Sequence, residues 1–422
     1  KDYSQIVHIT PAGWQINIGS FLVKQSQALV ITDSSATVKQ GLINSKKLKL
    51  TDINLDAGPV SIANDTIKTQ LLIGVTEQNA DLTIQELKAK ALITATGLQL
   101  DDLLLSTANS NISGKLGLQY STLYNFNDFV NLVGINLDLA KNSQLSLKDI
   151  AHFSSGLNGN SNLNKFMAYP VKIGGQITGR IPKLKAQNLE VQFKNTVLRG
   201  NVKLRGLPDI KNTNIDADIA SLNTDINEVK YFLPNNAKLP SQLNTLGKVQ
   251  MAGLFVGYIN EFIAEATVKT AVGTIKSDLK MALKGTANTT YSGRISAQNL
   301  DLGALTNKPE LLGKTSFDVN AAGKGLSLAT LATHLNGKIE YLTLKNYQYN
   351  NIEINGDIKQ QFFAGIVDVN DANLNLDFDG KIDFSQATPQ YRFNAKVDKA
   401  NLHQLNLLAA NAMGGNLTLN GI

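Results

Sequence analysis

The chain has 422 residues, of which 43% are hydrophobic and 18% charged, a composition typical of a folded protein rather than a disordered one. The chain has 40 lysines and arginines and 34 aspartates and glutamates, which gives a mild net charge of +6. The lysines and arginines are scattered singly along the sequence, so we expect no nucleic-acid partner. Because cysteine is absent, thiol catalysis, cysteinyl metal sites, iron–sulfur clusters and disulfides are excluded.

Most of the chain shows a period of two in hydropathy, which predicts β-strands with one apolar and one polar face. In chain order this alternation is found at Ile53–Leu55, Val202–Leu204, Ile215–Ile219 and Lys276–Leu283. Helical spacing of apolar residues is confined to short segments. It predicts helices at Leu123–Val133, Asp225–Leu233 and Ser327–Leu335, too few for a parallel α/β sheet.

The clearest alternation comes near the end of the sequence. Residues 373–384 place apolar side chains at the even positions other than Gly380 and Asn, Asp or Lys at every odd one, and a similar pattern covers residues 352–358. This predicts a continuous apolar face, because cross-strand neighbours in a hairpin share one face of the sheet. The candidate residues of a lipid groove on this face are Ile352, Ile354, Ile358, Leu374, Leu376, Phe378, Ile382 and Phe384.

Asn and Gly tolerate the positive φ angles of tight turns. They predict chain reversals at Asn336-Gly337, Asn350-Asn351 and Asp371–Asn373, and we interpret Asp379-Gly380 as a further hairpin. The same stretch matches half of a calcium loop, but Gln386 stands where the bidentate glutamate is needed.

No catalytic constellation is found in the sequence. Gly313-Lys314-Thr315 lacks the earlier glycine of a phosphate loop, because that position is Lys308. The histidines are far apart, and no nucleophile elbow is present. Paired carboxylates such as Asp216 and Asp218 are explained by the solvated face of a strand. We therefore expect a protein that is not an enzyme, with no catalytic residues, metal site or cofactor.

An apolar face of this kind has two interpretations. In a β-sandwich a second sheet covers it; in an open, curled sheet it is free to hold another apolar molecule. A right-handed β-helix is a third architecture, but its steady period of roughly 20–30 residues is not found. A carbohydrate-binding or adhesive surface protein is the alternative function, although a single Trp is a poor supply of sugar-stacking aromatics.

Residues 311–407 strongly resemble the TamB family of the translocation and assembly module, in the form common among Bacteroidota. The resemblance covers most of residues 100–422 and, less clearly, residues 1–100. The segments that carry it include Gly323–Leu326, Leu335–Ile339, Tyr347–Ile352, Phe378–Phe384, Ala400–Leu402 and, upstream, Leu147–Phe153, Gly206–Asp209 and Gly257–Phe262.

The resemblance implies a periplasmic protein of the AsmA-like, repeating β-groove group. Such a protein is anchored in the inner membrane at its N-terminus and meets an outer-membrane barrel of the Omp85 type at its C-terminal part. It also implies a role in outer-membrane assembly and in phospholipid passage between the two membranes of a Gram-negative bacterium. A structural scaffold that carries no lipid is the alternative within this class.

The predicted fold is all-β: an elongated, mostly antiparallel sheet curled into an apolar groove, with a few short helices. We expect one continuous array made of an N-terminal segment (1–110), middle units with short helices (111–246) and C-terminal repeats (247–422). Because the sequence ends in a strand-like run at Gly421-Ile422, we expect it to be a piece of a longer protein.

Overall fold

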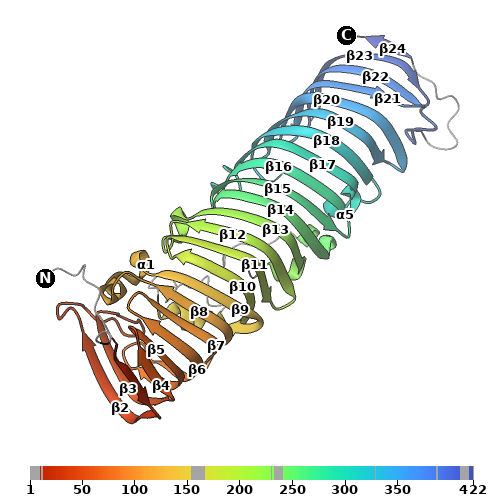
Figure 1. The fold of residues 1–422 in the computed structure, drawn as a ribbon. Coiled ribbons are helices and arrows are strands. Elements are labelled where there is room, and N and C mark those ends of the chain that lie inside the picture. The colour runs from red at the N-terminus through yellow and green to blue at the C-terminus, as the bar shows by residue number, and fades with distance from the viewer. Residues whose placement is uncertain are drawn as a thin grey trace. The chain divides into compact units, whose positions relative to one another are not determined.

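The computed structural model of the chain describes residues 10, 13–153, 167–229, 231, 241–327, 329–385, 388–408 and 418–421. The chain divides into two units, one formed by residues 1–213 with 231–237 and the other by residues 214–230 with 238–422. Both units consist mainly of long strands, drawn as curved ribbons in Figure 1. The all-β prediction is therefore confirmed.

The first unit contains strands β1 to β12 in an antiparallel sheet. From β5 onward each strand pairs with the next one in the sequence, while β3 also pairs with β5, and β1 joins the sheet through β4. The strands are β1 (Gln15–Ile18), β2 (Phe21–Ile31), β3 (Lys47–Ala57), β4 (Val60–Ala63), β5 (Thr66–Glu77), β6 (Leu82–Thr94), β7 (Gly97–Thr107), β8 (Asn111–Gln119), β9 (Gly134–Leu145), β10 (Val171–Arg180), β11 (Lys183–Phe193) and β12 (Thr196–Arg205).

The second unit contains strands β13 to β24, each paired antiparallel with its neighbours in the sequence. In the described residues no pairing joins its first strand to its last, so this sheet is open and is not a barrel. The strands are β13 (Asn214–Asp225), β14 (Lys248–Tyr258), β15 (Glu261–Thr270), β16 (Gly273–Ala282), β17 (Thr290–Asp301), β18 (Leu312–Lys324), β19 (Ala332–Leu344), β20 (Tyr347–Lys359), β21 (Phe362–Asn370), β22 (Leu374–Asp383), β23 (Gln390–Ala400) and β24 (Leu419–Gly421).

Mid-strand glycines let the strands bend. Gly337 in β19 and Gly365 in β21 have φ angles of 157° and 156°, a range that L side chains rarely adopt. A Cβ atom on Gly337 would lie 2.3 Å from the carbonyl oxygen of Asp318 in the neighbouring strand. Glycine is therefore required at these bends, in keeping with its use to curve β-sheets.

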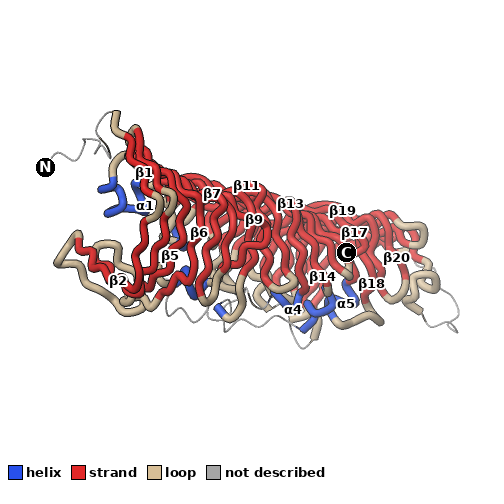
Figure 2. The backbone as a smooth tube through the Cα atoms, turned by 60° about the horizontal axis from the view of Figure 1, so that its bottom comes forward, coloured by secondary structure: helices blue, strands red, loops and turns tan. Residues whose placement is uncertain are grey.

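Helices are few and short in both units. The first unit has η1 (Leu123–Asp128), α1 (Phe129–Leu132), α2 (Leu147–Ala151) and η2 (Ile210–Asn212); the second has α4 (Ile226–Val229), η3 (Ser241–Leu246) and α5 (Leu302–Thr306). Figure 2 shows α4 and α5 along one edge of the strands of the second unit.

Two of the three predicted helices are found at least in part, and one is wrong. Leu123–Val133 matches η1 and α1, and α4 covers part of Asp225–Leu233, whose last two residues lie outside the described part of the chain. The predicted helix Ser327–Leu335 is wrong: residues 329–330 form a turn before β19 begins at Ala332, and Leu328 lies outside the described residues. There the cross-strand partners on β18 and β20 outweigh a weak helical spacing.

Three of the four predicted reversals are also wrong. Asp371–Asn373 does connect β21 and β22, but Asn336-Gly337, Asn350-Asn351 and Asp379-Gly380 lie inside β19, β20 and β22. Gly337 and Asn351 do have positive φ angles, of 157° and 51°. Positive φ at these positions bends a strand instead of reversing the chain, a distinction that depends on the neighbouring strands.

Candidate lipid-binding face

The apolar face of the second unit is built from four cross-strand ladders. A ladder is a series of directly paired residues, one from each strand from β13 to β23, and the four ladders occupy alternate positions on one face. None of the forty-four residues in them is charged.

The first ladder is Leu222, Met251, Val268, Ile275, Ala297, Phe317, Ile339, Ile352, Val369, Leu376 and Val397. The second ladder is Ile219, Gly253, Ala266, Ser277, Ile295, Val319, Gly337, Ile354, Val367, Phe378 and Ala395.

The third ladder is Ala217, Phe255, Ala264, Leu279, Gly293, Ala321, Leu335, Gly356, Gly365, Gly380 and Phe393. The fourth ladder is Ile215, Gly257, Phe262, Met281, Tyr291, Gly323, Thr333, Ile358, Phe363, Ile382 and Tyr391. Glycines are most frequent in the third ladder, which has four of them, whereas the second and fourth ladders have two each.

This face is the more shielded one. In β14 the ladder residues are half-buried, whereas the residues between them are exposed. The same contrast separates Ala264, which is half-buried, from Ala252 on the opposite face, which is exposed. Side chains on a curved sheet shield one another on its inner side, so the apolar face lines the inside of the curve.

Six of the eight predicted groove residues belong to the four ladders, and Leu374 and Phe384 do not. Ile352 and Leu376 belong to the first ladder, Ile354 and Phe378 to the second, and Ile358 and Ile382 to the fourth. Leu374 pairs with Ala400 beyond the first ladder. Phe384 lies past the end of β22, with its ring centroid 6.0 Å from that of Tyr391.

The first ladder is covered by residues of the same unit. Leu405 is 0% exposed and lies in one buried cluster with Tyr349, Ile352 and Val369, against which Leu376 also packs. Farther along, Leu302 and Leu305 of α5 pack against a second cluster that contains Ala297. We call this side, formed by α4, η3, α5 and the segment 401–407, the sealed edge.

From β14 to β23, the opposite side of the face has no helix in the described residues. It consists of the turns 258–261 and 360–361 and the loops 283–289, 325–331 and 384–389, of which residues 328, 386 and 387 lie outside the described part of the chain. Backbone hydrogen bonds join them, such as that from Gly325 N to Thr289 O at 2.9 Å and that from Gln360 N to Leu331 O at 2.9 Å. We call this side the open edge; next to it, Tyr391 of the fourth ladder is 57% exposed.

The first unit repeats this pattern over β5 to β12. One uncharged ladder runs through Ile67, Ile93, Leu98, Leu118, Ile135, Gly179, Leu184 and Leu204. Beside it runs another, formed by Thr69, Ala91, Leu100, Leu116, Leu137, Ile177, Ala186 and Val202. Candidate residues of this unit were not singled out from the sequence, although its alternation at Val202–Leu204 carries the same signal.

The polar face of the second unit is charged along its middle. Two ladders there hold four basic and eight acidic side chains: Lys276, Arg294, Lys338, Lys396, Asp218, Glu265, Asp278, Asp318, Glu353, Asp368, Asp377 and Asp379. These charges stand on the side of the sheet opposite the four apolar ladders.

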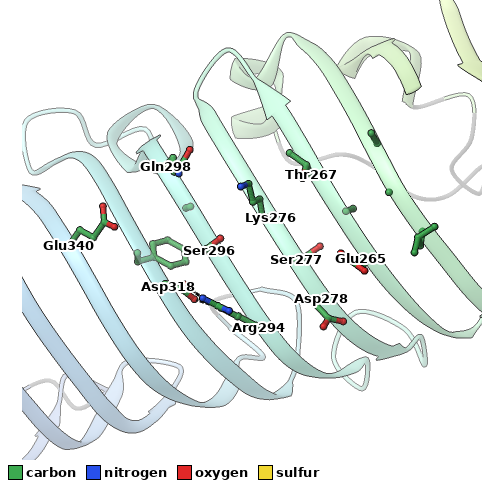
Figure 3. Close-up of a pocket in the computed structure, with 16 residues that line it drawn as sticks. Glu265, Thr267, Lys276, Ser277, Asp278, Arg294, Ser296, Gln298, Asp318 and Glu340 are labelled. Atoms are coloured by element: carbon green, nitrogen blue, oxygen red, sulfur yellow. Dashed lines mark hydrogen bonds and ion pairs between the residues drawn. The ribbon is translucent and has the colours of Figure 1, made fainter. Parts of the chain in front are cut away.

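A shallow hollow lined mostly by residues of this polar face is shown in Figure 3. Arg294 Nε donates to Asp318 Oδ1 at 2.7 Å, and this hydrogen bond lowers the pKa of the Asp318 carboxyl below its ordinary value. The labelled side chains around the pair include no histidine. An exposed ion pair of this kind contributes little to stability.

The described residues contain no group of His, Cys, Asp and Glu side chains that could hold a metal ion. His152 Nδ1 lies 3.0 Å from Gly41 O, and His334 Nδ1 lies 2.9 Å from Asp357 Oδ1 on the polar face; His8 is outside the described residues. Neither contact joins a histidine to a nucleophile.

One buried carboxylate has a structural role beside the first ladder. Asp371 accepts hydrogen bonds from the Tyr347 hydroxyl, from Asn350 N at 3.1 Å and from Asn373 N at 2.9 Å. Burial acts to raise the pKa of Asp371, but these hydrogen bonds outweigh it and hold the pKa below its ordinary value. The carboxylate thereby fixes the β21–β22 turn against β20.

Comparisons with protein-family models, with curated proteins and with solved structures found no match to this chain. In the part of the chain that the structure describes, no helix has both the length and the apolar character needed to cross a membrane.

Proposed function

We propose that this chain is a lipid-shielding segment of a periplasmic, TamB-like protein of outer-membrane biogenesis. Its apolar face would cover the acyl chains of phospholipids on their way between the inner and outer membranes. The observation that carries the proposal is the set of four uncharged ladders, which extends over eleven consecutive strands.

The energetics favour an acyl chain as the occupant of such a face. Each CH₂ group removed from water contributes about 0.8 kcal/mol. Because the ladders are uncharged and mostly apolar from strand to strand, this gain changes little with position along the face. A chain can therefore move along the face without first escaping from a deep, specific pocket.

The wider role rests on the resemblance of residues 311–407 to the TamB family. Under this proposal, regions outside residues 1–422 provide the inner-membrane anchor and the contact with an Omp85-type barrel. The chain itself is not an enzyme, and the work of moving lipid in one direction comes from elsewhere.

A scaffold without lipid is the second candidate, and one observation favours it. Leu405, Leu302 and Leu305 already cover the first ladder with the protein's own side chains. The third and fourth ladders have no such cover from these segments, so the two functions differ in what occupies them.

Native mass spectrometry of the chain purified from bacterial membranes, combined with lipid extraction, tests the proposal. We expect co-purified phospholipid, and less of it in Ile358→Asp, because Ile358 lies in the fourth ladder and a carboxylate there disfavours an acyl chain. Ile366→Asp is the matched control, since Ile366 is exposed on the polar face of the adjacent strand β21.

The fold should survive in both variants, as judged by circular dichroism. A wild-type chain that carries no lipid would support the scaffold, and equal lipid loss in both variants would contradict the assignment of the face. Leu376→Asp is a poorer probe, because Leu376 packs against the buried cluster around Leu405 and a charge there should destabilise the sheet itself.

A further inference from the structure

The two edges of the apolar face differ in a way that orients an amphiphile. Residues of the protein itself cover the first ladder at the sealed edge, whereas the fourth ladder borders loops and turns at the open edge. An acyl chain in the middle of the face can therefore extend its polar end only toward the open edge.

The rim of the open edge is basic over its central strands. On the polar side of this rim, directly paired residues run from Ala282 through Thr290, Lys324 and Ala332 to Lys359. Lys284 lies beside them, because its loop is joined to the next one through the bond from Gly325 N to Thr289 O.

These three lysines are exposed, and none of them forms an ion pair among the described residues. Acidic residues of the rim lie outside this stretch. Glu261, on β15, faces Lys280 at 3.9 Å, and Asp383 lies on β22 and accepts a hydrogen bond from Ser385 N at 2.8 Å. One row inward, Asp357 contacts His334.

From this asymmetry we propose that the open edge binds the phosphate of a phospholipid head group through Lys284, Lys324 and Lys359, while the acyl chains lie on the third and fourth ladders. Lysine side chains are long enough to keep their ammonium groups in water beside an apolar surface. The acidic middle of the polar face repels the same head group, so charge complementarity favours the rim. This inference rests on the proposed function.

The test compares two amphiphiles with the same chains. Dioleoyl phosphatidylglycerol and dioleoylglycerol differ in the phosphate head group, and binding of each to the full chain is measured by native mass spectrometry at several salt concentrations. We expect the phospholipid to bind roughly fivefold or more tightly, with a preference that falls as salt screens the lysines.

The variant K284E/K324E/K359E should lose this preference while it still binds dioleoylglycerol. The matched control is K308E/K314E/K345E, which makes the same charge change with exposed lysines of the sealed edge and should keep the preference within about twofold. Addition of glycerol phosphate should not displace the phospholipid, since the chains contribute most of the binding.

Equal loss in both triple variants, or an unchanged preference in K284E/K324E/K359E, would overturn the inference while leaving the proposed function intact. Displacement by glycerol phosphate would also overturn it, because the rim would then be a site for free phosphate esters. If the wild-type chain binds neither amphiphile, the proposed function itself fails.

Discussion

Asp371 shows how a single buried carboxylate can order a turn. Its hydrogen bonds come from β20 and from the turn that it occupies, and they stabilise the charged form more than the neutral one. Its folded-state pKa therefore lies below the value of about 3.9 expected for an unfolded chain. The stabilisation is fully present above that value and is lost as the pH falls through the lower, folded-state pKa.

We therefore expect Asp371→Asn to destabilise the β20–β22 region by about 1.5–3 kcal/mol at pH 7, with a smaller difference from the wild type below about pH 4. Hydrogen exchange of peptides from β20 to β22 measures this. Asp368→Asn is the control, because Asp368 is exposed on the polar face of β21. A difference that does not depend on pH would contradict the role of the carboxylate charge.

Gly337 provides a test of the bends. Gly337→Ala places a methyl group 2.3 Å from Asp318 O and strains a φ angle of 157°, so we expect a local loss of about 1–3 kcal/mol. Faster hydrogen exchange in β18 and β19 would reveal it. Gly134→Ala should have little effect on β8 and β9, because its added methyl group would meet nothing closer than 3.5 Å; equal effects would remove the special role of Gly337.

At the scale of elements, the segment 401–407 acts as a plug for the first ladder. Leu405→Ala should cost about 2–5 kcal/mol locally, because it leaves a cavity among Tyr349, Ile352 and Val369. Faster exchange of β20 and β21 is the expected readout. Leu407, in the same segment, is 47% exposed, and Leu407→Ala should change the exchange little; similar results for both would show that the segment does not plug the ladder.

Alternation in the sequence was sufficient to predict strands and the side of the sheet that each residue faces. Ile352 and Ile382 were assigned to one face and lie on it in different ladders, because a period of two is a local property of the backbone. The third ladder could not be predicted in this way. Gly356, Gly365 and Gly380 become neighbours only through the register of three strands, which depends on pairs distant in sequence.

The sealed edge could not be predicted from the sequence either. Leu402 and Leu405 have the spacing of a short apolar segment, but no local signal shows that they pack on Ile352, some fifty residues earlier. The functional part of the prediction rests on the resemblance to a family, since residue types alone cannot distinguish a free apolar face from a covered one.

At the scale of the whole molecule, both units present uncharged ladders. We therefore expect the full chain to carry more than one phospholipid in native mass spectrometry. Ile177→Asp in the first unit and Ile358→Asp in the second should each remove part of the bound lipid, and the double variant should remove nearly all of it.

Leu104→Asp is the control for the first unit, because Leu104 is 45% exposed and pairs with Lys88 on the opposite face. Complete loss of lipid from either single variant would contradict independent binding by the two units.

The pairing of each strand with its sequence neighbour also bears on how the protein is made. In the second unit the paired residues of neighbouring strands are close in the sequence, as Lys359 and Phe362 are. For β13 and β14, the paired residues that are farthest apart in the sequence are Ile215 and Gly257. Local contacts need little loop closure, and repeat-like arrays can grow from any nucleus. Each newly synthesised strand can therefore pair with the strand made just before it, and the sheet can assemble progressively during synthesis of the chain.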